Sequence, residues 1–578
     1  MYANRLMKSG MLKNILLILI FFVGCFFIPD CFVSRHVTTG MLGVAIITIL
    51  YALAFVRMVK VIKITPLFLW VFLYSIFWLM YQFFYSALAW HDWIGYISFL
   101  LLFLIVSQQE FGENELRQYY FIGSMAGMVM GTWGLLQYFE LVQAYYTSVP
   151  VTGSFENPAG LAIFLSGLLP CSLYFTREGK MRYKMWGIVT SLLAIWVILL
   201  SNSRTGILIM IVLCILYVCQ NISFPPRHRF VNKFLFLGIV LFLFVGLYFW
   251  KKDSADGRML IWLCSLDMFG DHWFFGIGSG KFQAEYMLYQ ADFFQWHPDS
   301  MFMMLADNVN NPFNEYLKVL VEYGIIGFSM VVMILVHLVK VCKANRDKVF
   351  LFPVFGCILA VMLAACFSYP LNYPSIVLIF VFSVAIVNSC YFSVWKVKKR
   401  ICVKGVAVGL VVFSLLFSRI VYCYGRSEYE WCKAARFSLE GRSEEMLPSY
   451  KEIYDWMRRD GLFLYNYGAE LYQVKRYSES LKILKECASR FNDEDVQQIL
   501  AKDYIQLGMY SEAKECLLLA AAMCPVRFVP LYELMNLHLR IKDFTEAKRY
   551  ARIIIDKPVK INSSRIRKIK KAAKVLLE

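Results

Sequence analysis

The chain carries at residues 350–368 the stretch FLFPVFGCILAVMLAACFS, in which no side chain is charged. A helix needs roughly 20 apolar residues to cross the hydrocarbon core of a bilayer, so this stretch predicts a membrane span. Similar runs recur from residue 11 to residue 422 and predict thirteen spans. Their approximate bounds are 11–29, 39–57, 66–86, 93–107, 118–138, 158–175, 185–200, 205–220, 234–250, 319–340, 350–368, 374–394 and 402–422.

The composition also indicates a membrane protein. Of the 578 residues, 59% are hydrophobic and 17% are charged, whereas soluble domains carry about 25% charged residues. The sequence therefore predicts an all-α fold, a polytopic membrane helix bundle of about 12–13 spans with a long external loop and a C-terminal helical repeat domain. The sixteen cysteines are scattered without a CxxC pair or a metal-ligand spacing, so they say little about function. No motif in the sequence predicts a metal site or a cofactor.

Basic residues in the predicted connections orient the chain. Arg5 and Lys8 precede the first span and Lys13 lies at its start; the span lacks a following cleavage site and is predicted to be retained with its N-terminus inside. Cytoplasmic loops are enriched in Lys and Arg. The even-numbered connections hold Arg57, Lys60 and Lys63; Arg177, Lys180, Arg182 and Lys184; Arg227, Arg229 and Lys233; Lys340, Lys343, Arg346 and Lys348; and Lys396, Lys398, Lys399 and Arg400. Thirteen crossings then place everything after residue 422 outside.

Two long segments lie between or after the predicted spans. The connection at 251–318 is rich in aromatic residues and glycine, unlike a disordered linker, so we expect it to fold against the outer face of the membrane. A polar tail follows the last span. The chain is thus predicted to divide into a transmembrane domain at 1–424 and an external repeat domain at 425–578.

A repeat in the tail has the period of tetratricopeptide units. The tetrads that begin at Tyr477, Tyr510 and Phe544 read Tyr-Ser-Glu-Ser, Tyr-Ser-Glu-Ala and Phe-Thr-Glu-Ala, at intervals of 33 and 34 residues. Stacked helix pairs of this kind present a concave surface, so a protein partner or acceptor could dock there. The alternative is a packed spacer that binds nothing.

The net charge of +18 has a simple explanation, because the cytoplasmic loop cations lie beside anionic lipid and no nucleic acid is required. The basic end from Arg565 to Lys574 predicts a cationic helix. Its outer face is solvated, or it contacts anionic lipid of the outer leaflet.

Arginines on the external side are disfavoured by topology and therefore indicate a binding role. Arg204 lies in the polar turn Ser201-Asn-Ser-Arg-Thr-Gly206 between two spans, and its alternative role is an interfacial anchor. Arg258 follows Ser254-Ala-Asp-Gly257, a plausible helix start, where a bound anion would offset an unfavourable cation. Lys281 adds positive charge in the stretch Gly276–Phe282, which lacks the strand of a nucleotide-binding loop and predicts a tight turn.

Polar residues on either side of this region could line a wet cavity at the membrane surface. Asp307, Glu315 or Glu322 could act as a general base, and His297 is the one histidine near this segment. Each could instead cap a helix or pair with a lysine. Further cavity or acceptor candidates are Glu156 and Asn157, before the sixth span, and Asn311 and Asn314, before the tenth.

Together these motifs resemble the O-antigen ligase and polymerase superfamily, in particular members with C-terminal tetratricopeptide repeats. The resemblance covers residues 10–400 or so and rests on motifs in the family's order. They are Phe155-Glu-Asn-Pro-Ala-Gly160, Ser201-Asn-Ser-Arg204-Thr-Gly206, Arg258-Met-Leu-Ile-Trp262, Gly276-Ile-Gly278-Ser-Gly280-Lys-Phe282, and Asn314-Glu-Tyr-Leu317 with Glu322-Tyr-Gly324.

The resemblance implies a metal-independent, inverting glycosyl transfer from an undecaprenyl-pyrophosphate donor on the periplasmic face of a bacterial inner membrane. Arg204 and Arg258 match the arginines that would hold the pyrophosphate. The family usually has a histidine just before the asparagine that matches Asn314, but Asn311, Pro312 and Phe313 stand there in this chain. His297 or Asp307 could replace it, or the acceptor could need only positioning.

The acceptor hydroxyl stays open at this point: it could belong to lipid A core, as in a lipopolysaccharide ligase, to another glycan, as in a polymerase, or to a protein, as in an O-oligosaccharyltransferase. A transporter or flippase is the alternative from another class, but it would normally place ionisable residues near the membrane midplane. A non-catalytic receptor would leave both arginines without a role.

Overall fold

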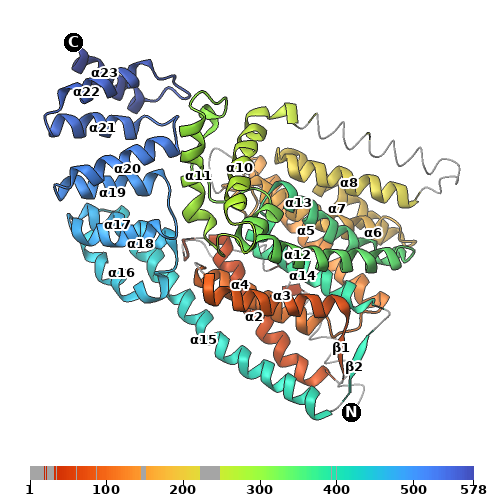
Figure 1. Ribbon diagram of the computed structural model, residues 1–578. Coiled ribbons are helices and arrows are strands. Elements are labelled where there is room, and N and C mark those ends of the chain that lie inside the picture. Colours follow the sequence, from red (N-terminus) through yellow and green to blue (C-terminus); the bar gives the residue numbers. More distant parts are fainter. Residues whose placement is uncertain are drawn as a thin grey trace.

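A computed structural model of the chain describes residues 18–19, 21–22, 31–33, 35–59, 61–85, 88–144, 151–221, 238, 246, 248–391, 394–398 and 400–578. Figure 1 shows a bundle of helices joined through one long helix, α15, to a stack of shorter helices. The bundle contains α2 (Arg35–Met58), β1 (Ile62–Ile64), α3 (Pro66–Tyr85), α4 (Trp90–Val106), α5 (Glu113–Tyr138), α6 (Pro158–Phe175), α7 (Met181–Leu200), α8 (Arg204–Asn221), α12 (Glu315–Ala344), η3 (Val349–Leu351), α13 (Phe352–Phe367), η4 (Pro370–Asn372), α14 (Pro374–Ser389), β2 (Trp395–Val397) and α15 (Arg400–Leu439).

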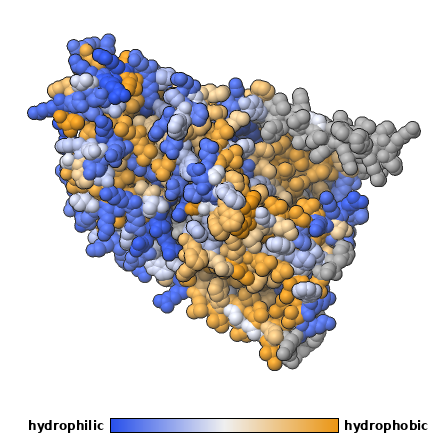
Figure 2. All heavy atoms as spheres, in the orientation of Figure 1, coloured by the Kyte–Doolittle hydropathy of each residue, from blue (hydrophilic) through white to orange (hydrophobic). Residues whose placement is uncertain are grey.

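The bundle confirms the predicted all-α membrane fold. Within the described parts of the chain, seven helices are long and apolar enough to cross a membrane, namely α2, α3, α6, α7, α12, α13 and α15, and the shorter apolar helices are α4, α8 and α14. The fifth predicted span corresponds to α5. The first and ninth predicted spans fall largely outside the described residues. Figure 2 shows a broad hydrophobic surface over the bundle, as expected for a face in contact with lipid.

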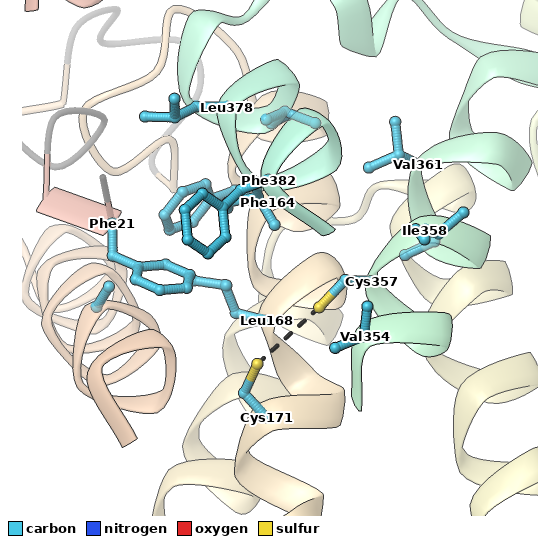
Figure 3. Close-up of a cluster of buried hydrophobic side chains, with 14 of the residues drawn as sticks. Phe21, Phe164, Leu168, Cys171, Val354, Cys357, Ile358, Val361, Leu378 and Phe382 are labelled. Carbon is cyan, nitrogen blue, oxygen red and sulfur yellow. Dashed lines mark hydrogen bonds between the residues drawn. The ribbon is translucent and has the colours of Figure 1, made fainter. Parts of the chain in front are cut away.

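Helix α6 forms the centre of the bundle, and small residues allow its neighbours to approach closely. A side chain at Gly206 would meet Ala162 Cβ at 2.4 Å, and one at Gly356 would meet Pro170 Cγ at 2.7 Å. Figure 3 shows the core around Phe164 and Leu168, with Phe382 from α14 and Cys357 from α13. Because lipid supplies no hydrophobic driving force, this close packing is what holds the helices together.

Connections that are predicted to be cytoplasmic meet at one end of the bundle. Strands β1 and β2 pair antiparallel with Lys63 opposite Lys396, and Lys63 Nζ lies 2.6 Å from Glu110 of the connection before α5. Arg117, at the start of α5, pairs with Glu178 of the connection after α6 at 3.0 Å. These contacts join four of the predicted inner connections, so the helix directions agree with the predicted alternation.

The long connection folds into two helices that lie across the opposite end. They are α10 (Lys252–Asp271) and α11 (Phe282–Trp296), followed by η2 (Met303–Leu305). The predicted tight turn between them is confirmed, because Gly276, Gly278 and Gly280 all have positive φ angles. The turn packs against a kink in α12 at Gly324 (φ +63°), where Ile325 N donates to Trp273 O at 2.9 Å. A Cβ at Gly324 would lie 2.3 Å from Phe274 O, so only glycine fits there.

The tail folds into α16 (Ser443–Met457), α17 (Gly461–Gln473), α18 (Tyr477–Ala488), α19 (Glu494–Gln506), α20 (Tyr510–Met523), α21 (Val529–Arg540), α22 (Phe544–Asp556) and α23 (Ser564–Leu577). The three tetrads open α18, α20 and α22, and the small residue of each, Ser480, Ala513 or Ala547, is fully buried. Figure 1 shows the helices stacked in chain order. The assignment to the tetratricopeptide class, and the boundary at 424–425 inside continuous α15, stay predictions.

A topology assay tests the predicted orientation. Alkaline phosphatase fused after Glu440, beyond the 40-residue helix α15, is expected to be active because thirteen crossings end outside. The same enzyme fused after Lys398, in the connection that contains β2, should be inactive. Fusions with the reverse activities would remove an odd number of spans from the prediction.

Candidate functional site

Arg204 is the first residue of α8 and lies at the end of the bundle where the long connection begins. The turn before it contains Asn202 with a positive φ of 52°, and Ser201 Oγ donates to Ile198 O at 2.6 Å. The Arg204 guanidinium donates to Lys251 O at 3.0 Å and to Ser254 Oγ at 2.9 Å. These bonds fix the start of α10 against the start of α8.

Arg258 projects from the second turn of α10, because the helix begins at Lys252. The predicted helix start at 254–257 is therefore wrong, and it is Arg204 that places a cation at a helix N-terminus. The Arg258 guanidinium lies 5.3 Å from the centre of the Phe313 ring. Within the described residues it forms neither an ion pair nor a hydrogen bond. Burial lowers the pKa of Arg258 to about 10, and the charge of Arg204 acts in the same direction.

Two arginines close enough to repel each other, one of them without a counter-ion among the described residues, favour a bound anion. In water two free guanidinium groups would move apart, because their like charges repel each other. Here the backbone holds the two guanidinium groups at one end of the bundle, so the repulsion is built into the folded chain. An anion with several oxygen atoms, such as a phosphate, would relieve it.

Two tyrosines that the sequence analysis did not select complete this part of the site. Tyr369 and Tyr373 flank η4, and Asn157 Nδ2 donates to both hydroxyl groups, at 3.0 and 2.5 Å. The Tyr369 ring lies 5.3 Å from the Phe313 ring, and its hydroxyl interacts electrostatically with Arg258. Their signal in the sequence was Ser368-Tyr-Pro-Leu-Asn-Tyr373, a polar break between two apolar runs.

The predicted cavity residues contact these tyrosines directly or through one neighbour. Asn157 caps α6 by accepting from Gly160 N at 2.8 Å, and Glu156 lies within electrostatic range of Tyr373. Asn314 caps α12 by accepting from Leu317 N at 3.1 Å. Glu315 accepts from Leu371 N, also at 3.1 Å, which fastens η4 to α12.

The segment before α12 is held as a strained turn. Phe313 has a positive φ of 53°, and Trp262 of α10 donates from its indole nitrogen to Pro312 O at 2.9 Å. Asn311, in the same turn, is half-buried. The strain is stored where the Phe313 ring meets Arg258, as is common at binding sites.

Glu322 belongs to a second polar cluster, on the side of α12 that faces α3 and α4. It is buried, and its charge interacts with those of Lys318, Glu315 and Asp92. Lys318, which is half-buried, was not selected from the sequence, although it stands one helical turn from Glu322. Glu315 is the residue that both clusters share, since it also holds η4.

The remaining predicted residues have contacts in other parts of the external connection and in the repeat domain. The Asp307 carboxylate pairs with Arg527 of the repeat domain at 2.7 Å. His297 ends α11, is exposed, and stacks on Phe293 with ring centres 4.7 Å apart. Lys281 is the residue before α11, and its aliphatic stem packs against Gly278 in the glycine turn. Their proposed roles in chemistry stay predictions.

Replacement of Asn157 tests the links between α6 and the tyrosines. Asn157→Leu removes the helix cap and both bonds to tyrosine, and should lower the free energy of unfolding by about 2 kcal/mol. Asn157→Asp keeps the cap acceptor but cannot donate, so roughly half of that loss is expected. Thermal unfolding of the detergent-solubilised protein measures both. An Asn157→Asp variant as stable as the wild type would show that the tyrosine bonds contribute nothing.

One comparison with known proteins matches the segment that contains both arginines. Residues 189–332 match the family model described as O-Antigen ligase. The matched segment contains Arg204, all of α10 and α11, Phe313 and the first half of α12. A comparison with curated proteins gives no match. The segment that carries both arginines is thus similar to O-antigen ligases, and this similarity supports placing the chain in the O-antigen ligase superfamily.

Proposed function

We propose that the protein transfers a glycan from an undecaprenyl-pyrophosphate donor to an acceptor hydroxyl on the periplasmic face of a bacterial inner membrane. The observation that carries the proposal is the convergence of Arg204 and Arg258, from separate helices, inside the segment that matches the O-antigen ligase model. An anion held there lies where a lipid-linked pyrophosphate would reach the outer surface.

The two arginines account for leaving-group stabilisation. In an inverting transfer, the acceptor oxygen attacks the anomeric carbon from the face opposite the pyrophosphate. The bond from that carbon to the phosphate oxygen breaks, and negative charge grows on the pyrophosphate. Guanidinium donors that are already in place stabilise this charge without reorganisation of solvent, and one such donor is typically worth about 100- to 1000-fold in rate. No step in this scheme requires a metal.

The tyrosines and Asn157 fit a positioning role beside the arginines. The Tyr369 and Tyr373 hydroxyl groups both accept from Asn157, which holds the two rings beside the arginines, where a phosphate or sugar oxygen would lie. Asn311, Asn314 and Glu156 lie on the same side of the bundle and supply further polar groups for the acceptor. Lys281 would contribute only to the positive electrostatic field at the pyrophosphate, from a longer distance than the two arginines.

Among the candidates for the general base, contacts favour Glu322 over Asp307. Asp307 already accepts a charge-assisted bond from Arg527 and a bond from Asn308 N at 2.9 Å, so its oxygens are occupied by contacts with other parts of the chain. Glu322 lies in a water-poor cluster beside Lys318, joined to the arginine site through Glu315. His297 is exposed at the end of α11, where its Nδ1 lies 3.0 Å from Phe293 O and its ring stacks on Phe293.

The acceptor class is tested by supplying purified protein with undecaprenyl-pyrophosphate glycan and, in separate reactions, lipid A core, a second lipid-linked repeat unit, or a serine-rich protein. Transfer to one of the three identifies a ligase, a polymerase or a protein O-oligosaccharyltransferase. The external repeat domain favours the protein acceptor, because stacked helices suit peptide docking. Donor that stays intact with every acceptor would count against a transferase.

A further inference from the structure

Among the described residues, ion pairs attach the repeat domain to the rest of the chain at two places. At one, Arg527 pairs with Asp307 of the external connection at 2.7 Å, and an arginine keeps its charge at any pH that the protein meets. At the other, His91 in the first turn of α4 meets Asp460, which directly precedes α17. The second contact therefore depends on a side chain that can gain or lose its charge between about pH 5 and 8.

His91 lies between two carboxylates that come from different parts of the chain. Its Nε2 is 3.3 Å from Asp92 Oδ1, and its Nδ1 is 3.7 Å from Asp460 Oδ2. Asp460 also caps α17, because it accepts from Leu462 N at 2.9 Å and from Phe463 N at 3.1 Å. The side chains of His91 and Asp460 are 30% and 13% exposed, so water screens their contact only in part.

The two ring nitrogens indicate which form of His91 fits this place. A neutral imidazole has an N–H donor on one nitrogen and a lone pair on the other, whereas the protonated ring has a donor on each. Because a carboxylate faces each nitrogen, a neutral ring would turn one lone pair toward a negative oxygen. The positions of Asp92 and Asp460 therefore favour the protonated ring.

The charges around His91 are mainly negative. Glu428 is buried, accepts from Thr38 Oγ1 at 2.7 and 2.8 Å, and acts on His91 as a third carboxylate. Burial disfavours the charged ring, but the three carboxylates outweigh it and raise the pKa of His91. The titratable and charged groups that surround the ring on the described elements are Asp92 of α4, Tyr424 and Glu428 of α15, Lys318 of α12, and Asp460 with its neighbour Arg459 before α17.

Apolar contacts lie beside this polar junction. The Trp90 and Trp456 rings are 5.6 Å apart, and Ile94 of α4 belongs to the same buried cluster as Phe463 of α17. The continuous helix α15 also joins the two domains. Loss of the charge on His91 would therefore loosen the junction and would not detach the repeat domain.

We propose that protonation of His91 controls how firmly the repeat domain is attached to the end of the bundle where α4 begins. The protonated ring holds Asp460, and with it the start of α17, against α4. The neutral ring leaves three carboxylates close together without the cation between them. The attachment is complete below the ordinary histidine pKa of about 6.5, and it weakens as the pH rises through the raised pKa of the bound ring.

Hydrogen exchange of residues 458–464 in the full-length protein in nanodiscs, at about pH 6 and about pH 8.5, tests this proposal. After correction for the intrinsic effect of pH on exchange, protection in the wild type should fall roughly tenfold at the higher pH, which corresponds to about 1.4 kcal/mol. His91→Gln cannot be protonated and should show the low protection at both pH values. His91→Lys keeps its charge throughout this range and should show the high protection at both.

The matched control is His272→Gln, which removes an exposed histidine at the end of α10 and should keep the pH dependence of the wild type. Thermal unfolding shows whether each variant is folded. Protection that does not change with pH in the wild type would overturn the proposal, as would the same pH dependence in the wild type and in His91→Gln. Exchange is measured without substrate, so the outcome does not depend on the proposed glycan transfer.

Discussion

Arg258→Ala is expected to lower the rate of glycan transfer by about 100- to 1000-fold while the protein remains folded. The guanidinium has no ion pair or hydrogen bond to lose among the described residues, so little structural cost should follow its removal. Under the proposed function, the substitution removes the charge that would face the growing negative charge on the pyrophosphate. The rate constant at saturating donor should therefore fall more than the affinity for the donor.

Two further substitutions separate charge from geometry at this position. Arg258→Lys keeps one positive charge but loses the planar pair of donors, and should recover only part of the rate. Arg346→Ala, which removes an arginine that is 80% exposed at the opposite end of the bundle, is the control and should transfer at the wild-type rate. If Arg258→Ala and Arg346→Ala had the same rate, the anion would have to bind elsewhere.

Arg527→Ala is expected to separate the repeat domain from the external connection. Arg527 neutralises Glu494, whose side chain is fully buried, and also holds Asp307. Removal of one partner of a buried pair leaves an uncompensated charge and costs about 3 kcal/mol. Hydrogen exchange of residues 300–314 should accelerate by roughly 100-fold, because 1.4 kcal/mol corresponds to a factor of ten.

The contacts near Arg527 explain why this effect should reach the arginine site. Gln290 donates to Met523 O at 2.7 Å, and Asn308 donates to Asp495 at 3.0 Å, so the repeat domain fastens both α11 and the segment that leads to Phe313. Loss of these bonds would loosen the ring on which Arg258 rests. A lower transfer rate should accompany the faster exchange.

Two controls distinguish a buried charge from a general weakening. Adding Glu494→Gln to Arg527→Ala removes the uncompensated carboxylate and should restore most of the protection. Arg476→Ala breaks an exposed pair with Glu479 and should cost well under 1 kcal/mol. Indistinguishable exchange in Arg527→Ala and Arg476→Ala would mean that the ion pair does not hold the domains together.

The spans and the helix pairs of the tail could be predicted because their signals are local. The run at 350–368 is apolar throughout, and α13 occupies it. The tetrads at Tyr477, Tyr510 and Phe544 each begin a helix. They recur because each pair of packed helices needs a small residue at one position of the contact. The start of α10 was less predictable. Lys252 and Asp253 continue a helix as readily as Ser254 can begin one, and the bonds from Arg204 to Lys251 and Ser254 arise only in the folded chain.

Residues of the candidate site could be predicted where a charge stood on the predicted external side of the membrane. Residues that join the site through contacts between distant parts of the chain could not. Arg204 and Arg258 stood out as external cations. Tyr369 and Tyr373 did not, because a polar break between two spans is common, and their link to Asn157 crosses more than two hundred residues. The partner of Asp307 was hidden for the same reason, since Arg527 lies in another domain. Lys318 was not predicted as a site residue, because its interaction with Asp92 depends on which side of α12 faces α4 in the folded chain.

The most direct measurement follows donor and product together in proteoliposomes that contain purified wild-type protein or the double variant Arg204→Ala/Arg258→Ala. For the wild type we predict that labelled glycan becomes covalently attached to the acceptor and that an equal amount of undecaprenyl pyrophosphate is released. For the double variant we predict neither product. Glycan that crosses the bilayer while still attached to its lipid would contradict the account and indicate a transporter. Equal turnover in the wild type and the double variant would remove the arginine pair from the chemistry.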